Sequence, residues 1–443
     1  MNNMNIPKGS TEVLGSVDGD LFLSDGARVK AKDSEKVEVS GTVQFEGNCT
    51  FECSLSASSV RGKRGTLYVE GDLSVQKTIR IYDGSLDVDG NLSAVNVDVD
   101  KKVSIGKNLS VEDMNVGGNI WIGGNTEAGE VTVGGYFESY GDVTVTKIDV
   151  GGAIKIAGAT KSSKISVGGT FHGKGLVKVD RINVGGKLVT ESEIVAENIS
   201  VGGAVRVAGG EIKGRINVGG AFESSKPLFF NLIDVGGKVI LAGESKGRMV
   251  SVGGSLRTDG YLEFVDIEVG GTVRINGNAE GQTIDVGGRL VVEGNLTLAG
   301  KLDVGGTAEV SGTLKADSIS VGGSVKALKI EAEGSVEAGG RIETKEGTKA
   351  ETVEIGRKGK IIGVLVAKEV LLEERAEARD IYAEYLTMEE GSKARNVYAK
   401  RVHLERGCSI TGELRYTEEL KKAEDTHFAQ EPEKTENLPA PPI

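Results

Sequence analysis

Aliphatic and polar residues alternate in short runs along most of the chain, and a glycine pair ends each run. In the run Ile182–Asn183–Val184, two aliphatic residues flank a polar one, and Gly185 and Gly186 follow. Alternation with a period of two is typical of a β-strand that has one buried face. β-Branched residues dominate the aliphatic places, which also favours strands. The pattern therefore predicts short strands, each followed by a corner.

The tripeptide Val-Gly-Gly returns every seventeen residues, with one extra residue before Val304. Helical repeats need about 33 to 47 residues and propeller blades about 40. Seventeen residues suffice for one coil of three short strands and three corners. We therefore predict a parallel β-helix in which each valine contacts its counterparts in the adjacent coils. The structural coil positions are Val116, Val133, Val150, Val167, Val184, Val201, Val218, Val235, Val252, Val269, Val286, Val304 and Val321.

The glycine pair is expected at a corner of the coil. A corner often needs a positive φ or a residue without a Cβ atom, and glycine supplies both. The missing side chain also lets successive coils stack closely.

The repeat is looser at both ends of the chain. Residues 341–410 are rich in Ala, Glu, Leu and Arg, which favours helix, but Ala367, Ala383 and Ala399 are sixteen residues apart. This register predicts further coils rather than a helical hairpin. Residues 415–428 have the composition of a short helix, and the Pro-rich residues after them are typical of disorder. The predicted segments are an N-terminal segment or cap (1–36), irregular coils (37–115), regular coils (116–340), C-terminal coils in a 16–17-residue register (341–410) and a flexible Pro-rich tail (411–443).

Composition narrows the class of protein. The 443 residues include 66 Gly but only 6 Pro, which excludes collagen. The net charge of −12 disfavours nucleic-acid binding. Three cysteines do not make a disulfide framework and suit a reducing compartment. We find no signal peptide and no apolar run of membrane-spanning length. These features predict a cytoplasmic protein without membrane attachment.

The residues offer little catalytic or metal-binding chemistry. Cys49 and Cys53 form a C-x₃-C pair without the second pair that a zinc site needs. His403 and Cys408 share one predicted coil, and a surface position explains His172 better than catalysis. No phosphate-binding loop occurs. We predict no cofactor, no metal, no catalytic residue and no enzymatic activity. Weak cation binding along the stacked acidic places stays open as an alternative at Glu268, Asp285 and Asp303.

The corners "DGNLSA" and "VGGxL" and the late segment "NVYAKRVHLERGCSITGELRY" resemble those of the bactofilins, the polymer-forming cytoskeletal proteins. The resemblance covers about residues 37–416. It implies an all-β fold consisting of a single elongated, right-handed parallel β-helix, with about 17-residue coils and short non-regular termini. It also implies nucleotide-independent polymerisation end to end. The coil region here is several-fold longer than in typical members, and the N-terminal residues do not match their membrane-binding segment.

Three kinds of function are compatible with these patterns. An open β-helix exposes unpaired backbone groups on its last coil, which can pair with another molecule. We therefore expect a non-enzymatic structural protein that forms homopolymers, with other cytoskeletal or envelope-associated proteins as further possible partners. The alternatives are a capped monomeric rod that acts as a spacer or lateral scaffold, and a cell-surface repeat protein. The candidate polymer interface consists of Leu386, Met388, Val402, Leu404 and Ile410.

Overall fold

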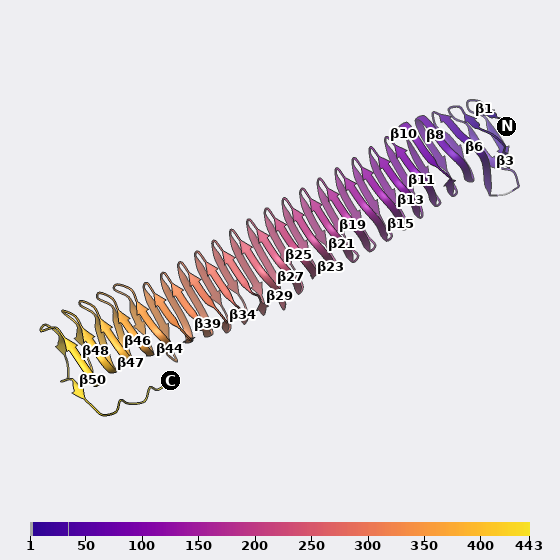
Figure 1. The fold of residues 1–443 in the computed structure, drawn as a ribbon. Coiled ribbons are helices and arrows are strands. Elements are labelled where there is room, and N and C mark those ends of the chain that lie inside the picture. Colours follow the sequence, from indigo (N-terminus) through magenta and orange to yellow (C-terminus); the bar gives the residue numbers. More distant parts are fainter. Residues whose placement is uncertain (1–2, 34) are drawn as a thin grey trace. The chain divides into compact units, whose positions relative to one another are not determined.

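The computed structural model describes residues 3–33 and 35–443, and none of these residues lies in a helix. They form a parallel β-solenoid of short strands that follow one another coil by coil (Figure 1). Contacts between residues divide the chain into two compact units, Met1–Gly220 (unit 1) and Ala221–Ile443 (unit 2). The predicted all-β parallel β-helix is confirmed.

Unit 1 contains the strands β1 (Met4–Ile6), β2 (Thr11–Leu14), β3 (Ser16–Val17), β4 (Leu21–Leu23), β5 (Arg28–Ala31), β6 (Lys36–Glu46), β7 (Cys49–Phe51), β8 (Ser54–Val69), β9 (Leu73–Val75), β10 (Thr78–Val88), β11 (Leu92–Val99), β12 (Lys102–Ile105), β13 (Leu109–Val116), β14 (Asn119–Ile122), β15 (Thr126–Val133), β16 (Tyr136–Ser139), β17 (Val143–Val150), β18 (Ala153–Ile156), β19 (Thr160–Val167), β20 (Thr170–Gly173), β21 (Val177–Val184), β22 (Lys187–Thr190), β23 (Ile194–Val201), β24 (Ala204–Val207) and β25 (Gly210–Val218).

Unit 2 contains the strands β26 (Ala221–Ser224), β27 (Leu228–Val235), β28 (Lys238–Ala242), β29 (Ser245–Val252), β30 (Ser255–Asp259), β31 (Leu262–Glu263), β32 (Asp266–Val269), β33 (Thr272–Ile275), β34 (Ala279–Gly281), β35 (Thr283–Val286), β36 (Arg289–Val292), β37 (Leu296–Leu298), β38 (Lys301–Val304), β39 (Thr307–Ala316), β40 (Ser318–Val321), β41 (Ser324–Ala332), β42 (Ser335–Ala338), β43 (Arg341–Thr344), β44 (Thr348–Ile355), β45 (Lys360–Ile362), β46 (Val364–Leu372), β47 (Glu377–Met388), β48 (Lys393–Leu404), β49 (Ser409–Ile410), β50 (Leu414–Lys422), β51 (His427–Phe428) and β52 (Glu433–Lys434).

Each regular coil has three sides. In the coil that follows Gly152, β18 forms the first side, and β19 forms the second and third sides because it bends at Ser163 and Lys164. Inward residues are buried on every side, and two successive outward residues mark the bend. The third side ends with the valine of Val-Gly-Gly.

The registers of the paired strands place the repeated valines beside one another. Val184 of β21 pairs with Val201 of β23, and Val252 of β29 pairs with Val269 of β32. All four side chains are buried. The seventeen-residue interval is therefore the length of one coil, and burial of this aliphatic column is a principal driving force for stacking.

The glycine pairs are needed for close approach rather than for an unusual φ. Gly185 and Gly186 are not among the glycines with positive φ. A Cβ atom on Gly185 would lie only 2.2 Å from the carbonyl oxygen of Gly168 in the preceding coil. Of the two expected reasons for glycine at the corner, the missing Cβ is therefore confirmed at this pair, and positive φ does not apply there.

Asparagine side chains support another corner, between the first and second sides. Asn108 Oδ1 accepts a hydrogen bond from the backbone N–H of Asn125 at 2.8 Å. Asn125 Oδ1 accepts one in turn from the N–H of Asp142 at 2.9 Å. Because each side chain binds the backbone of the next coil, this ladder satisfies donors that a turn leaves without a strand partner.

The coils extend beyond the limits that the repeat indicated. In unit 1, β1 to β3 pair with β4 to β6, so residues before 37 already belong to the parallel ladder. In unit 2, the sixteen-residue register is confirmed as coils, since Ala367 pairs with Ala383 and Ala383 with Ala399. The short helix expected over residues 415–428 is wrong: the structure has the strands β50 and β51 there.

Candidate functional site

The residues predicted as a polymer interface do not lie on an exposed edge. All five are buried: Leu386 and Met388 on β47, Val402 and Leu404 on β48, and Ile410 on β49. β47 lies between β46 and β48, which fill both of its edges. These residues therefore form internal parts of the core, and their assignment to an exposed end is wrong.

A further coil covers them. Leu420 of β50 pairs with Val402, Lys422 with Leu404, and Phe428 of β51 with Ile410. Leu420 follows Val402 by eighteen residues instead of sixteen, because the register of β50 shifts after Tyr416. In the sequence, this further coil could have been recognised from Leu414, which follows Val397 by seventeen residues.

The outer edge of β50 in unit 2 is open over most of its length. Its partner β52 pairs only with Arg415 and Tyr416. Within the part of the chain that the structure describes, residues 417–422 of β50 therefore have a paired strand on one side only. Glu419 and Lys421 point outward and are exposed, while Leu420 between them is half-buried. Glu419 Oε1 lies 3.3 Å from Lys421 Nζ.

A charged residue occupies the inward column of this last coil. Lys422 takes the place that Met388 and Leu404 occupy in the coils before it. Its Nζ lies 5.0 Å from the ring centroid of Phe428, a cation–π distance. An inward charge on an edge strand is one way in which proteins discourage edge-to-edge pairing.

The first coil, formed by β1 to β3 in unit 1, also has an open edge. Unlike the last coil, it has apolar residues that are almost fully buried. Ile6, Leu14 and Val17 are at most 8% exposed although they belong to the first coil. Val13 is 54% exposed and points outward on β2. Ile6, Leu14 and Val17 are thus largely covered, whereas Met4 and Glu12, which also take inward places, are half-buried.

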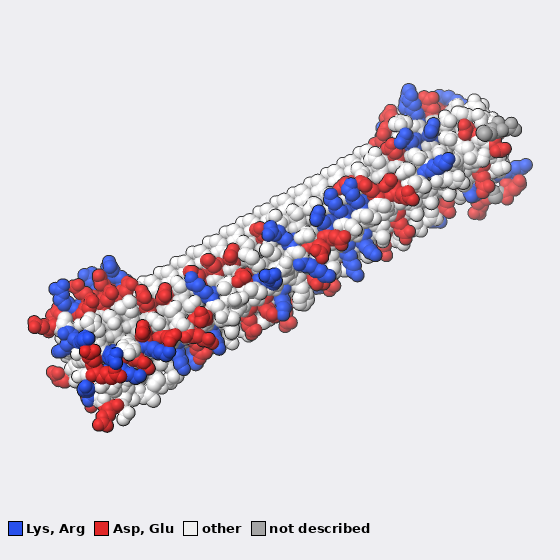
Figure 2. All heavy atoms as spheres, viewed as in Figure 1, with Lys and Arg blue, Asp and Glu red and all other residues white. Residues whose placement is uncertain are grey.

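Ion pairs between adjacent coils cover much of the surface. In unit 1, Lys155 Nζ lies 2.7 Å from Glu138 Oε1, and the hydrogen bond to Glu138 raises the pKa of Lys155. In unit 2, Lys360 Nζ lies 2.8 Å from Glu377, whose pKa it lowers. Figure 2 shows Lys and Arg intermixed with Asp and Glu in this way. Exposed pairs contribute roughly 0–1 kcal/mol each, so they affect surface charge more than stability.

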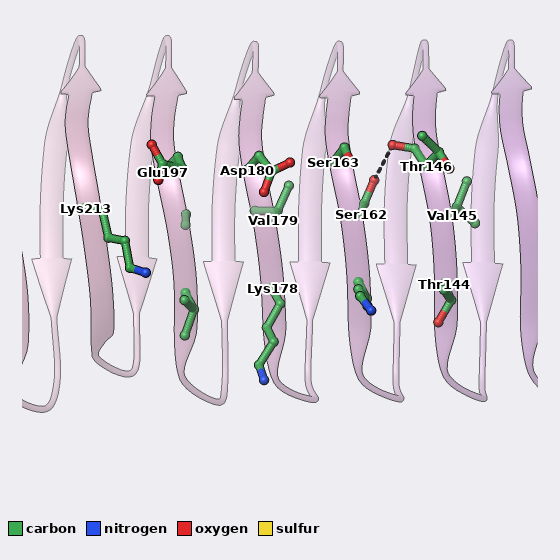
Figure 3. Close-up of a pocket in the computed structure, with 13 residues that line it drawn as sticks. Thr144, Val145, Thr146, Ser162, Ser163, Lys178, Val179, Asp180, Glu197 and Lys213 are labelled. Atoms are coloured by element: carbon green, nitrogen blue, oxygen red, sulfur yellow. Dashed lines mark hydrogen bonds between the residues drawn. The ribbon is translucent and has the colours of Figure 1, made fainter.

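A shallow groove follows the second side of the coils in unit 1 (Figure 3). Its volume is about 330 Å³, and its lining includes the inward residues Val145, Ser162, Val179 and Ala196. Lys178 lies along one margin and Asp180 and Glu197 along the other, with Lys213 at one end of the groove. Ser162 Oγ donates to the carbonyl oxygen of Thr146 at 3.2 Å. The groove therefore presents charges of both signs without a cluster that points to one reaction.

The thiols and imidazoles do not come together. Cys49, Cys53 and Cys408 are buried and free. Burial raises the pKa of Cys49 to about 11, and it also raises the pKa of Cys408. The Cys408 thiol donates to the carbonyl oxygen of Glu389 at 3.2 Å. His172 Nε2 lies 2.7 Å from Glu191 at the surface. A thiol held protonated in this way is a poor nucleophile.

The acidic places considered for cation binding do lie on adjacent coils. Glu268 pairs with Asp285, and Asp285 with Asp303. Lys301 Nζ lies 2.7 Å from Asp303 and offsets its charge. Over residues 3–33 and 35–443, no group of three or more His, Cys, Asp or Glu side chains is arranged to hold a metal ion. The same residues contain no apolar helix of membrane-spanning length.

The fold defines a class of protein, the parallel β-solenoid repeat proteins. Comparison of the chain with known protein families, with curated proteins and with solved structures finds no match.

Proposed function

We propose that this chain is a non-enzymatic structural protein, bactofilin-like in kind, whose copies associate through their open strand edges. The observation that carries the proposal is the edge of β50, where residues 417–422 have unpaired backbone groups on one side. Such an edge is a template for a strand of a second molecule. Association through it needs no nucleotide and no cofactor, and a location in the cytoplasm is consistent with the three free thiols.

The charges on β50 favour one arrangement of two copies. Glu419 and Lys421 flank Leu420 on the outward face. If two β50 edges pair antiparallel about Leu420, Glu419 of each copy lies opposite Lys421 of the other. Opposite charges directly across a strand pair are favourable, and like charges are unfavourable. Parallel pairing in register would instead place like charges together.

Charge reversal tests this contact in the full-length chain. Glu419→Lys and Lys421→Glu each put like charges opposite one another, so each variant alone should self-associate about tenfold more weakly than the native chain. An equimolar mixture of the two variants should recover the native sedimentation profile. His403→Ala, outward on the preceding strand, serves as a control. A mixture that associates no better than either variant alone would show that β50 edges do not pair in this way.

A capped rod is the second candidate, and the inward charge at Lys422 favours it. In a monomeric scaffold, both end coils must be protected from pairing with another strand. Lys422 has this effect on the last coil, and the burial of Ile6 has it on the first. For a capped rod, the native chain should sediment as a monomer at every concentration. Lys422→Leu should then promote association, because it restores the apolar column above Leu404.

A further inference from the structure

The residues that follow β52 run back along unit 2. β52 extends the second side of the last coil, and the backbone N–H of Thr435 donates to the carbonyl oxygen of Tyr416 at 2.9 Å. Eight residues later the chain reaches an earlier coil, where a Cβ atom on Gly347 would lie 2.3 Å from Ile443 Cδ1. Figure 1 shows this stretch leaving the end of the solenoid and turning back toward β44.

The length of this stretch matches an extended conformation. From β52 the second side steps back through β50, β48, β47 and β46 to β44, which is five coil spacings. At ~4.8 Å per spacing this distance is about 24 Å. Residues 435–443 in a polyproline II conformation, at ~3.1 Å per residue, span about 28 Å. A segment of this length can therefore reach from β52 to Gly347 along the second side, although it bends at Glu436 and Asn437.

Two stacked tyrosines lie on that side. The outward column next to Gly347 runs from Lys349 through Val366 to Tyr382 and Tyr398. The Tyr382 and Tyr398 rings are 4.8 Å apart between centroids. Both rings are half-buried although they point outward, and burial raises the pKa of both hydroxyls. Tyr385, outward on the third side, is 41% exposed.

We infer that Tyr382 and Tyr398 form a docking surface for an extended Pro-rich peptide, and that residues 435–443 of the chain itself occupy it. The segment carries Pro439, which is half-buried, and Pro441 and Pro442, which are exposed in this structure. Prolines in a polyproline II helix dock on aromatic-lined grooves at low entropic cost, because the conformation is already formed. The inference does not depend on whether copies of the chain polymerise.

Peptide binding to full-length variants tests the inference. Leu438→Asp with Ile443→Asp should release the segment and free the tyrosines. A fluorescent peptide with the sequence of residues 433–443 should then bind at least tenfold more tightly than it binds the native chain. Adding Tyr382→Ala and Tyr398→Ala should abolish this gain, whereas adding Tyr385→Ala should leave it intact. Equal binding to the native and released chains, no binding to the released chain, or binding that survives loss of both tyrosines, would each overturn the inference.

A second measurement avoids the need for peptide affinity. If the segment is docked, a protease specific for glutamate should cleave after Glu436 mainly when the segment leaves the surface. Cleavage in the native chain should be about tenfold slower than in Tyr382→Ala/Tyr398→Ala, with Tyr385→Ala at the native rate. Equal rates in the native chain and the double variant would contradict docking on these rings. Circular dichroism of each variant confirms that the strands remain folded.

Discussion

At the scale of residues, the stacking of the coils depends on the missing Cβ atoms of the corner glycines as much as on the apolar side chains of the core. Gly185 brings its backbone against the carbonyl of Gly168, and no side chain fits between them. The inward columns hold Val, Ile, Leu and Phe, with a few buried hydroxyls such as that of Thr160. Each position repeats in the next coil, so one substitution acts on two neighbours at once.

We predict that Gly185→Ala destabilises unit 1 by about 1–3 kcal/mol, the usual cost of forcing extra atoms into a packed site. Its Cβ atom would meet backbone atoms, which cannot rotate away. Gly15→Ala is the matched control, because no atom lies within 4 Å of its added Cβ. Denaturant unfolding measures both variants. Equal midpoints for them would contradict the close-approach explanation.

Thr160→Val should stabilise unit 1 by roughly 1–2 kcal/mol. The Thr160 hydroxyl is buried without a hydrogen-bond partner in the described residues, and an unsatisfied buried group costs about that much. Val143 and Val177 are its neighbours in the column, so valine continues an existing pattern. Thr126→Val, whose hydroxyl lies 3.4 Å from Ser139 Oγ, should give no such gain. A lower unfolding midpoint for Thr160→Val would count against an orphaned hydroxyl.

At the scale of elements, the repeat interval of the sequence was enough to predict the coils, but not enough to predict the last coil. The seventeen- and sixteen-residue intervals correctly predicted which strands pair, as in Val184 with Val201. The interval fails at β50, where an extra residue sits at the bend between the second and third sides. That residue moved Leu420 out of register, and the local composition favours helix. The candidate edge could not be found without the backbone path.

This bend absorbs extra residues elsewhere as well. In the eighteen-residue coil before Val304, Gly300 lies at this bend. Gly281 still pairs with Leu298 seventeen residues later, whereas Val286 pairs with Val304 eighteen residues later, so the extra residue lies between them. In unit 1 the register of β25 shifts at the same bend. An insertion there lengthens the outward turn, whereas one inside a strand reverses the facing of every later residue in that strand.

We therefore expect one Gly inserted between Ser163 and Lys164 to be tolerated, with a change in the unfolding midpoint close to the error of the measurement. One Gly inserted between Ile165 and Ser166 should cost several kcal/mol, because it displaces the buried column on the third side. Denaturant unfolding and limited proteolysis compare the two. Similar losses from both insertions would contradict the assignment of the bend.

At the scale of the whole molecule, each coil contacts only its neighbours, as in other solenoid proteins. Such a ladder ends in unpaired backbone groups unless a cap or another molecule covers them. The β50 edge and the inward Lys422 act in opposite directions on this choice, the first toward association and the second toward capping. We therefore expect self-association to depend on the last coil more than on any side chain in the groove.

Electron microscopy of the purified native chain over a range of concentrations tests the central claim most directly. We predict particles two chains long, joined through their β50 edges, that replace single chains as concentration rises, without added nucleotide. The Glu419→Lys variant should give shorter particles under the same conditions. Discrete particles of one fixed length at every concentration, unchanged by that substitution, would contradict assembly through the open edge.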